Sequence, residues 1–337
     1  MEEQYILLNK LNAKVVHSNS YDPWFNLALE EYLLNSLSEN EVIFYLWQNQ
    51  NTVVIGNNQN SWKECRIDEL NIDGGKLARR LSGGGAVFHD LGNLNFTFLA
   101  SNDNFDINKQ LHVILHALKT FGINAEFSGR NDIEVLGKKF SGNAFYYGDK
   151  RNYHHGTLLV DVNMSRLSKY LKVSESKFKS KGIDSVKARV INLKEINPLL
   201  TIEDLKTSLV KSFCEVYSVN PEEYVVDENT EEIKELYEKY SSWNWIYGES
   251  PEFDIEYEDR FSFGNVQLCL KINNGIITQC KVFTDALDTT FPTIIETALK
   301  NVPFQKEAMI KTVQNSANNV QSRIIDEIIV KWRGNLI

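Results

Sequence analysis

The fold class is decided by Leu94-Asn95-Phe96-Thr97-Phe98 together with residues 107–121. The first five residues alternate apolar and polar side chains, which predicts a β-strand with one buried and one exposed face. Apolar residues then recur at helical spacing across residues 111–118, and Gly122 is typical of a helix C-terminus. A strand followed by an amphipathic helix indicates an α+β domain.

The neighbouring segments continue this mixture. Asp22-Pro23 provides an N-cap and a first-turn proline, so we expect a helix to begin there. Residues 42–47 and 52–55 are apolar runs that predict buried strands. Residues 133–136 and 138–147 are predicted to be strands that turn at Gly137. A further strand is expected at residues 157–162, and Ser165 is expected to cap the next helix.

A second domain is indicated near the C-terminus. Residues 241–251 contain the turn residues of a domain junction, including Gly248 and Pro251. Residues 266–272 alternate in the manner of a strand, and Asn274-Gly275 predicts the tight turn of a β-hairpin. Helices are predicted from residue 291 and over residues 320–330. We therefore expect a large α+β domain over residues 1–245 and a small α+β domain over residues 246–337.

Composition excludes several classes of protein. The net charge of -9 over 337 residues argues against general nucleic-acid binding, which needs a basic surface. No apolar stretch is long enough to cross a bilayer, and the acidic start Met1-Glu2-Glu3-Gln4 lacks the basic region of a secretory signal. Four widely spaced cysteines are expected to be reduced. Together these features predict a cytoplasmic protein without membrane attachment.

The densest chemical signal is Arg79-Arg80-Leu81-Ser82-Gly83-Gly84-Gly85-Ala86-Val87-Phe88-His89-Asp90. Consecutive glycines cost conformational entropy, and they are useful where a backbone must approach an anion closely. Two arginines beside them can bind carboxylate or phosphate. No Gly-Lys-Ser/Thr ends the run, and strand rather than helix follows, so neither a P-loop nor a dinucleotide fingerprint is present. An exposed glycine-rich turn remains the alternative.

A second signal surrounds Lys139. Its ammonium can stabilise negative charge that develops in a transition state, and Asp132 can provide an oxygen ligand for Mg²⁺. The alternative is that Lys138 and Lys139 are the exposed edge of a hairpin and Asp132 a turn residue. The consecutive His154 and His155 should point to opposite faces of a strand, which argues against a shared metal ion.

In combination, these segments resemble the bacterial two-domain lipoate–protein ligases, part of the biotin/lipoate ligase superfamily. The resemblance covers nearly the whole chain and rests on Ser20-Tyr21-Asp22-Pro23-Trp24-Phe25-Asn26-Leu27-Ala28, Thr52-Val53-Val54-Ile55-Gly56, residues 60–65, 78–92 and 128–133, Lys139-Phe140-Ser141-Gly142, His154-His155-Gly156-Thr157-Leu158, residues 181–186 and 189–193, Ser242-Trp243-Asn244-Trp245 and Val282-Phe283-Thr284-Asp285.

The resemblance implies an α+β catalytic domain of the biotin/lipoate-ligase fold, with mixed sheets flanked by helices, and a small α+β C-terminal accessory domain. It implies that lipoate and MgATP form lipoyl-AMP, and that an acceptor lysine then takes the lipoyl group. ATP contacts are implied for Arg80, Gly85, Ala86, Val87, Phe88 and Lys139. Lipoate contacts are implied for Lys139, Gly83, Gly84, His89, His155 and Gly156, with Lys139 catalytic and Asp132 a ligand of Mg²⁺.

Acceptors implied by the resemblance are lipoyl domains of 2-oxoacid dehydrogenase E2 subunits or the glycine-cleavage H protein, and a monomeric enzyme is expected. One departure concerns substrate preference, because Asn57 stands where many members have arginine. Two alternatives stay open. A related octanoyl or lipoyl transferase would use a cysteine nucleophile, yet no cysteine lies in the glycine-rich, Lys139 or His154 segments. A non-catalytic lipoate-binding homologue would keep the fold alone.

Overall fold

A computed structural model describes residues 11–128, 131–172, 190–248, 253–316 and 322–335. The sequence features at residues 1–4, 129–130, 181–186, 189, 249–251 and 320–321 lie outside these ranges. The chain divides into two compact units. The first unit comprises Met1–Val54, Cys65–Ala78 and Val87–Ile246. The second unit comprises Ile55–Glu64, Arg79–Ala86 and Tyr247–Ile337.

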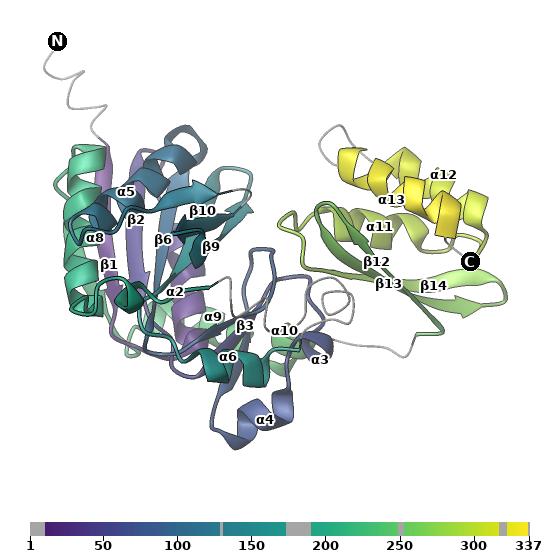
Figure 1. Cartoon of the computed structure of the whole chain (residues 1–337). Helices are drawn as coiled ribbons and strands as arrows, with labels where there is room; N and C mark the ends of the chain where they lie inside the picture. The colour runs from purple at the N-terminus through teal and green to yellow at the C-terminus, as the bar shows by residue number, and fades with distance from the viewer. Residues whose placement is uncertain (1–10, 129–130, 173–189, 249–252, 317–321, 336–337) are drawn as a thin grey trace, which may run out of the picture. The chain divides into compact units, whose positions relative to one another are not determined.

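The first unit, in its described residues, is built on an eight-stranded sheet in the order β11-β1-β2-β6-β10-β9-β8-β7 (Figure 1). Its strands are β1 (Asn12–Ser18), β2 (Glu41–Trp47), β6 (Asn93–Ser101), β7 (Glu126–Ser128), β8 (Asp132–Val135), β9 (Lys138–Tyr147), β10 (Arg151–Leu159) and β11 (Glu222–Val226). β1 runs parallel to β2 and β11, and the other neighbours are antiparallel. This mixed sheet confirms the predicted α+β class.

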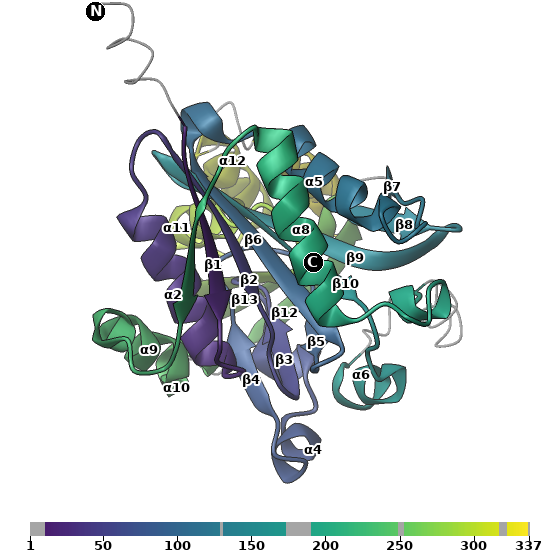
Figure 2. The same cartoon turned by 90° about the vertical axis from the view of Figure 1, so that its left-hand side faces the viewer.

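Helices cover both faces of this sheet (Figure 2). α5 (Ile107–Lys119) and α8 (Ile202–Tyr217) pack on one face and share a core with β1, β2 and β6. In that core the Phe44 and Phe98 rings stack with centroids 4.4 Å apart, and Phe213 of α8 lies 5.3 Å from Phe44. α2 (Pro23–Ser36) covers the other face, with α9 (Lys234–Ser241) against it.

β6 is buried along its whole length, so the predicted exposed face is wrong. The alternation is real, but both sets of side chains are covered. Phe96 and Phe98 face α5 and α8, whereas Thr97 faces α2 and donates to Glu30 Oε1 at 2.7 Å. A polar residue at every second position therefore marks a second buried face whose polar atoms have protein partners.

Short sequence patterns predicted several helix ends and turns correctly. The Asp22 carboxylate accepts from Trp24 N at 3.0 Å at the start of α2. Gly122 follows α5 with a positive φ of 72°. Leu136 and Gly137 both have positive φ, as the tight turn between β8 and β9 requires.

Two local predictions were wrong. β10 begins at Arg151, six positions before the predicted residue 157. Asn163, not Ser165, caps α6 (Met164–Tyr170), because its Oδ1 accepts from Ser165 N at 3.1 Å and Arg166 N at 3.3 Å. Part of the predicted junction is the short helix α10 (Trp243–Tyr247).

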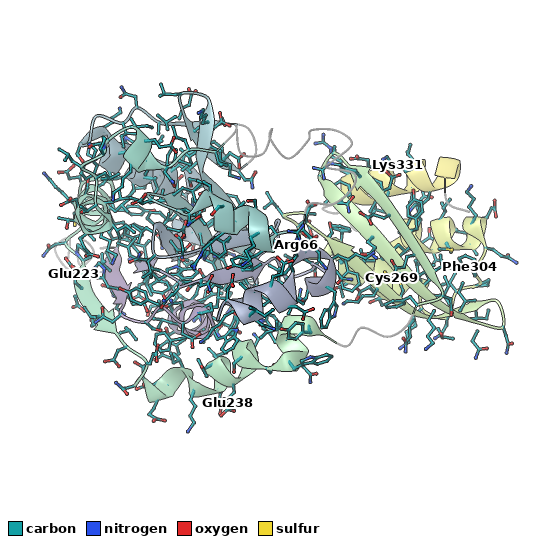
Figure 3. All side chains as sticks on the ribbon, turned by 60° about the horizontal axis from the view of Figure 1, so that its bottom comes forward. Arg66, Glu223, Glu238, Cys269, Phe304 and Lys331 are labelled. Carbon is teal, nitrogen blue, oxygen red and sulfur yellow. The ribbon has the colours of Figure 1, made fainter. Side chains whose placement is uncertain are left out.

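The first part of the chain also contains a small second sheet and several short helices. A three-stranded sheet has the order β4-β3-β5, formed by β3 (Thr52–Ile55), β4 (Lys76–Arg79) and β5 (Val87–His89). The other short helices are α3 (Ser61–Glu64), α4 (Ile67–Ile72) and the 3₁₀ turns η1 (Asn102–Asn104), η2 (Leu193–Glu195) and η3 (Glu231–Ile233). Glu223 of β11 and Glu238 of α9 are exposed on this unit (Figure 3).

The second unit contains a three-stranded antiparallel sheet, in the order β12 (Ile255–Phe261), β13 (Gly264–Asn273) and β14 (Ile276–Thr284). The predicted hairpin turn is confirmed, with Asn274 and Gly275 both at positive φ. Three helices complete its core, namely α11 (Phe291–Leu299), α12 (Lys306–Ser316) and α13 (Ser322–Asn335). On α13, Lys331 Nζ lies 2.6 Å from Asp259 Oδ1 of β12 (Figure 3).

Two N-terminal segments belong to this second unit. Asn58 O accepts from Thr284 N at 2.7 Å, and Asn58 Nδ2 donates to Thr289 O at 3.1 Å. Lys63 pairs with Glu256 of β12 at 2.8 Å. These contacts tie residues 55–64 to the small sheet, although about two hundred residues separate them along the chain. Within the described ranges, the structure contains no helix that is both long and apolar enough to span a bilayer.

We predict that Phe98→Ala lowers the free energy of unfolding by about 3–5 kcal/mol, because it removes the ring at the centre of the α5–α8 core. Phe127→Ala on β7 is the matched control, since that ring is 39% exposed and its loss should cost less than about 1 kcal/mol. Urea denaturation of both variants measures the difference. Equal midpoints for the two would contradict the assignment of the core.

Candidate functional site

The predicted site residues fall into two groups, one in each unit. Asp132, Lys139, His155 and Gly156 lie on β8, β9 and β10 of the first unit, together with Val87, Phe88 and His89 of β5. Arg80 and the run from Gly83 to Ala86 belong to the second unit.

Lys139 and Asp132 form an ion pair, with Nζ 2.6 Å from Oδ1 and each side chain about one-third exposed. A β-bulge produces this arrangement. Asp132 pairs with Gly142 and Glu134 with Lys139, so β9 has an extra residue between these two pairs. Asp132 and Glu134 share a face of β8, and Lys139 therefore lies on the same face as Gly142 despite the odd spacing. Without the bulge, Lys139 would point to the opposite face of the sheet.

Gly142 leaves room for the ammonium group. A Cβ atom at this position would lie 3.0 Å from Lys139 Nζ and 3.2 Å from its Cε. The backbone of Lys139 is fixed from the other side, because its carbonyl accepts from Ile191 N at 2.9 Å. The Lys139-Phe140-Ser141-Gly142 pattern thus has a local physical cause: a bulge that re-aims a lysine beside a residue without a side chain.

His155 lies in the buried layer between the sheet and α2. Its Nδ1 is 2.9 Å from Glu30 Oε1, which also accepts from Thr97 Oγ1. Trp47 Nε1 donates to Thr97 Oγ1 at 3.0 Å. Glu30 was missed from the sequence, although an acidic residue directly after Leu27-Ala28-Leu29 on an apolar helix was an available signal.

His154 points to the opposite face, as predicted, and is completely buried. Its Nδ1 lies 3.1 Å from Gln110 Oε1 and its Nε2 lies 2.8 Å from Asn143 Oδ1. Burial, with a smaller contribution from His155, lowers the pKa of His154 to about 3. Gly156 is required by packing here, because a Cβ there would lie 2.5 Å from Phe96 Cζ and 2.7 Å from Asn143 Oδ1.

The two arginines of the glycine-rich segment are both buried and bind backbone. Arg80 donates to Ser82 Oγ at 3.1 Å and, through Nη2, to Gly83 O at 2.7 Å and Gly85 O at 2.8 Å. Arg80 therefore stabilises the loop through hydrogen bonds to the loop's own backbone carbonyls.

Arg79 has a different set of partners. It donates to Asn57 O and Gln59 O, each at 2.7 Å, and to Ser61 Oγ at 2.9 Å. Burial lowers its pKa to about 10. Arg79 thereby fixes the backbone of the segment that contains Asn57.

The three glycines differ in what surrounds them. A Cβ on Gly83 would lie 2.3 Å from Ala286 O and 2.5 Å from Leu287 O. Gly84 has a φ of 91° and donates its N–H to Ala286 O at 2.8 Å. Gly85 has open space where a side chain would begin. The close backbone approach at Gly83 and Gly84 is thus made to the protein's own chain, and approach to an anion stays a prediction.

His89 is buried at the end of β5, opposite Thr52 of β3. Its Nδ1 is 3.2 Å from Asn49 Nδ2, and its ring meets the Trp47 ring edge-on at 6.2 Å. Asn49 in turn accepts from Asn26 Nδ2 at 3.0 Å. A buried network of amide side chains therefore fixes the orientation of His89.

Thiol chemistry is disfavoured throughout. All four cysteines are free. Burial raises the pKa of Cys65 and of Cys269 to about 12 and raises the pKa of Cys214 and Cys280 as well. A nucleophilic cysteine needs a lowered pKa. The environment of these thiols argues against a cysteine-dependent transferase.

No group of three or more metal-binding His, Cys, Asp or Glu side chains occurs among the residues that the structure describes. Asp132 presents a partly exposed carboxylate beside the Lys139 ammonium. One carboxylate is enough for Mg²⁺ that takes its other ligands from nucleotide phosphates and water.

Known proteins provide an independent comparison. Residues 22–214 match the family model of the lipoyl protein ligase A/B catalytic domain, and residues 250–332 match that of the bacterial lipoate protein ligase C-terminus. Lipoate-protein ligase A of Psychrobacter cryohalolentis is 41% identical over 335 residues, covering 96% of this chain and 98% of that protein.

Solved structures agree with the sequence matches. The structure of P. falciparum LipL1 in complex with lipoate has a TM-score of 0.84 and 34% identity, covering 95% of this chain and 99% of that one. A lipoate-protein ligase A bound with ATP has a TM-score of 0.61 and 26% identity, covering 70% of this chain and 99% of that one.

The buried His154 predicts a pH-dependent stability. Its folded pKa of about 3 lies below the unfolded value of about 6.5, so stability is present above pH 6.5 and is lost as the pH falls toward 3. Between pH 7 and pH 5 the loss should be about 2 kcal/mol. Denaturation at both pH values should show this extra loss in the parent relative to His154→Gln. Parallel pH dependence in the two proteins would contradict a buried neutral His154.

Proposed function

Because this chain belongs to the lipoate–protein ligase family, we propose that it activates lipoate with ATP and transfers the lipoyl group to a lysine of an acceptor protein. In the first step a lipoate carboxylate oxygen attacks the α-phosphorus of ATP, and the bond to the β-phosphate oxygen breaks. Lipoyl-AMP and pyrophosphate result. In the second step the neutral acceptor amine attacks the lipoyl carbonyl, the amine loses a proton, and AMP leaves.

The observation that carries this proposal is the placement of Lys139. The bulge in β9 and the missing side chain at Gly142 leave its ammonium on an open face of the strand, one-third exposed. A fixed ammonium can hold the lipoate carboxylate against the α-phosphate and stabilise the charge that develops there. In the state described, Asp132 neutralises it, and an incoming carboxylate or phosphate would take over that interaction.

We assign nucleotide contacts to Lys139, Arg80 and the run from Gly85 to Phe88. The unobstructed Gly85 supports close approach by a phosphate to the backbone. Arg80 is held by loop carbonyls, so its guanidinium supports the loop's shape even before a nucleotide binds. Asp132 would hold Mg²⁺, which supplies charge neutralisation at the phosphates when bound.

We assign lipoate contacts to Lys139, Gly83, Gly84, His89, His155 and Gly156. The orientation of His155 is set by Glu30 and that of His89 by Asn49, so both rings are fixed before substrate arrives. Gly156 is already required by Phe96 and Asn143, and its proposed contribution is therefore limited to its backbone. Because Asn57 stands where the resemblance leads us to expect arginine, octanoate should be tested as a second substrate.

The proposed acceptors are lipoyl domains of 2-oxoacid dehydrogenase E2 subunits or the glycine-cleavage H protein. The proposed enzyme is a monomer that acts in the cytoplasm, where its free cysteines would stay reduced. Its net charge of -9 requires a local basic contact if the acceptor surface is acidic.

Lys139→Ala should reduce lipoate-dependent ATP–pyrophosphate exchange on the order of 10²- to 10³-fold, because it removes a fixed charge from the reacting groups. Lys138→Ala is the matched control, since its side chain is exposed on the same strand and should be dispensable. Circular dichroism verifies that both variants fold. Full exchange activity in Lys139→Ala would contradict the proposed role of Lys139. Absence of exchange activity in the parent protein would contradict the proposed function.

Intact-mass spectrometry of apo acceptors provides a second test. With MgATP and lipoate, the parent protein should add one lipoyl group to one acceptor lysine, and omission of ATP should abolish the addition. Parallel reactions with octanoate measure the effect of Asn57 on acyl preference. An acyl adduct on an enzyme cysteine, formed without ATP, would instead support the transferase alternative.

A further inference from the structure

Asn143 connects the buried core of the first unit with the Lys139–Asp132 pair. Its backbone N–H and its side-chain Nδ2 both donate to Asn131 O, at 2.8 and 3.1 Å. Asn131 Nδ2 returns a hydrogen bond to Asn143 O at 3.2 Å. Asn131 directly precedes Asp132, so these three hydrogen bonds fix the backbone from which the Asp132 carboxylate projects.

The other end of the Asn143 amide is held by His154. A neutral imidazole donates through one nitrogen only, and the Asn143 Nδ2 is already a donor to Asn131. The Asn143 oxygen is therefore the acceptor from His154 Nε2 at 2.8 Å. Because the side chains of Asn143 and His154 are 3% and 0% exposed, water cannot replace either contact readily.

Gly156 maintains the space that this arrangement needs. A side chain at Gly156 would begin 2.7 Å from Asn143 Oδ1 and displace the amide. The consecutive His154-His155-Gly156 thus has three separate uses: His154 holds Asn143, His155 pairs with Glu30, and Gly156 leaves room for the Asn143 amide.

We propose that Asn143 is a positioning residue, which holds Asn131 so that the Asp132 carboxylate stays against the Lys139 ammonium. The inference rests on the proposed function for its consequence in catalysis, but its structural content concerns only the Lys139–Asp132 pair. Residues that orient a reacting group through one intermediate typically change activity about 10- to 100-fold when they are removed.

The first experiment measures the pair without catalysis. Lys139 acetylation by a dilute amine-reactive reagent is followed by peptide mass spectrometry in the parent, Asn143→Ala and Asp132→Asn. Loss of the pair in Asp132→Asn should raise the rate several-fold, and Asn143→Ala should approach that rate. Asn152→Ala is the matched control, because Asn152 is also buried, on β10, and bonds Asn102 instead. A parent-like rate in Asn143→Ala would overturn the inference, whatever the enzyme's activity.

The second experiment measures the effect on turnover. In Asn143→Ala, kcat for lipoate-dependent exchange should fall about 10- to 100-fold with little change in the KM for ATP, and Asn152→Ala should retain parental kcat. In the Lys139→Ala background, Asn143→Ala should cause no further loss. An equal loss in both backgrounds would show that Asn143 acts through general stability, and the positioning role would be wrong.

Discussion

The carboxylate of Glu30, buried between the sheet and α2, is the constraint on which the first unit depends. A charge in this layer is tolerated only with partners, and Thr97 and His155 provide them at 2.7 and 2.9 Å. These two contacts join α2 to β6 and β10. Once His155 faces Glu30, strand alternation turns His154 to the other face, where it meets Asn143. The orientation of residues near Lys139 thus follows from one buried acid on a helix.

Much of the fold was predictable because its signals are local. The capped start of α2 and the turns at Gly137 and Asn274-Gly275 depend on a few adjacent residues, and all are confirmed. The exposed face predicted for β6 failed because burial depends on a distant helix. Nothing local distinguishes a polar residue facing water from Thr97 facing Glu30. The association of residues 55–64 with β14 was likewise beyond any pattern of adjacent residues.

The site shows the same limit. Residue types and spacing identified Lys139, Asp132 and the glycine-rich segment as candidates, and the structure brings Lys139 and Asp132 together. The bulge that makes this possible was invisible in the sequence, because it appears only in the register between β8 and β9. Glu30 and the role of Asn143 were missed for a related reason: each depends on partners more than ten residues away. The glycines at 83 and 84 were predicted to allow close approach to an anion, which stays a prediction; in the structure their backbone lies against Ala286.

The raised pKa values of the four thiols have a consequence for substrate handling. Lipoate carries a cyclic disulfide, and a thiolate can open such a ring to leave a mixed disulfide on the protein. The rate depends on the fraction of thiol that is ionised, which is very small when the pKa is raised to about 12, as at Cys65 and Cys269. A protein that binds this substrate is thereby less prone to covalent capture by it. The raised pKa values of Cys65 and Cys269 therefore make both thiols weakly reactive toward the disulfide of lipoate.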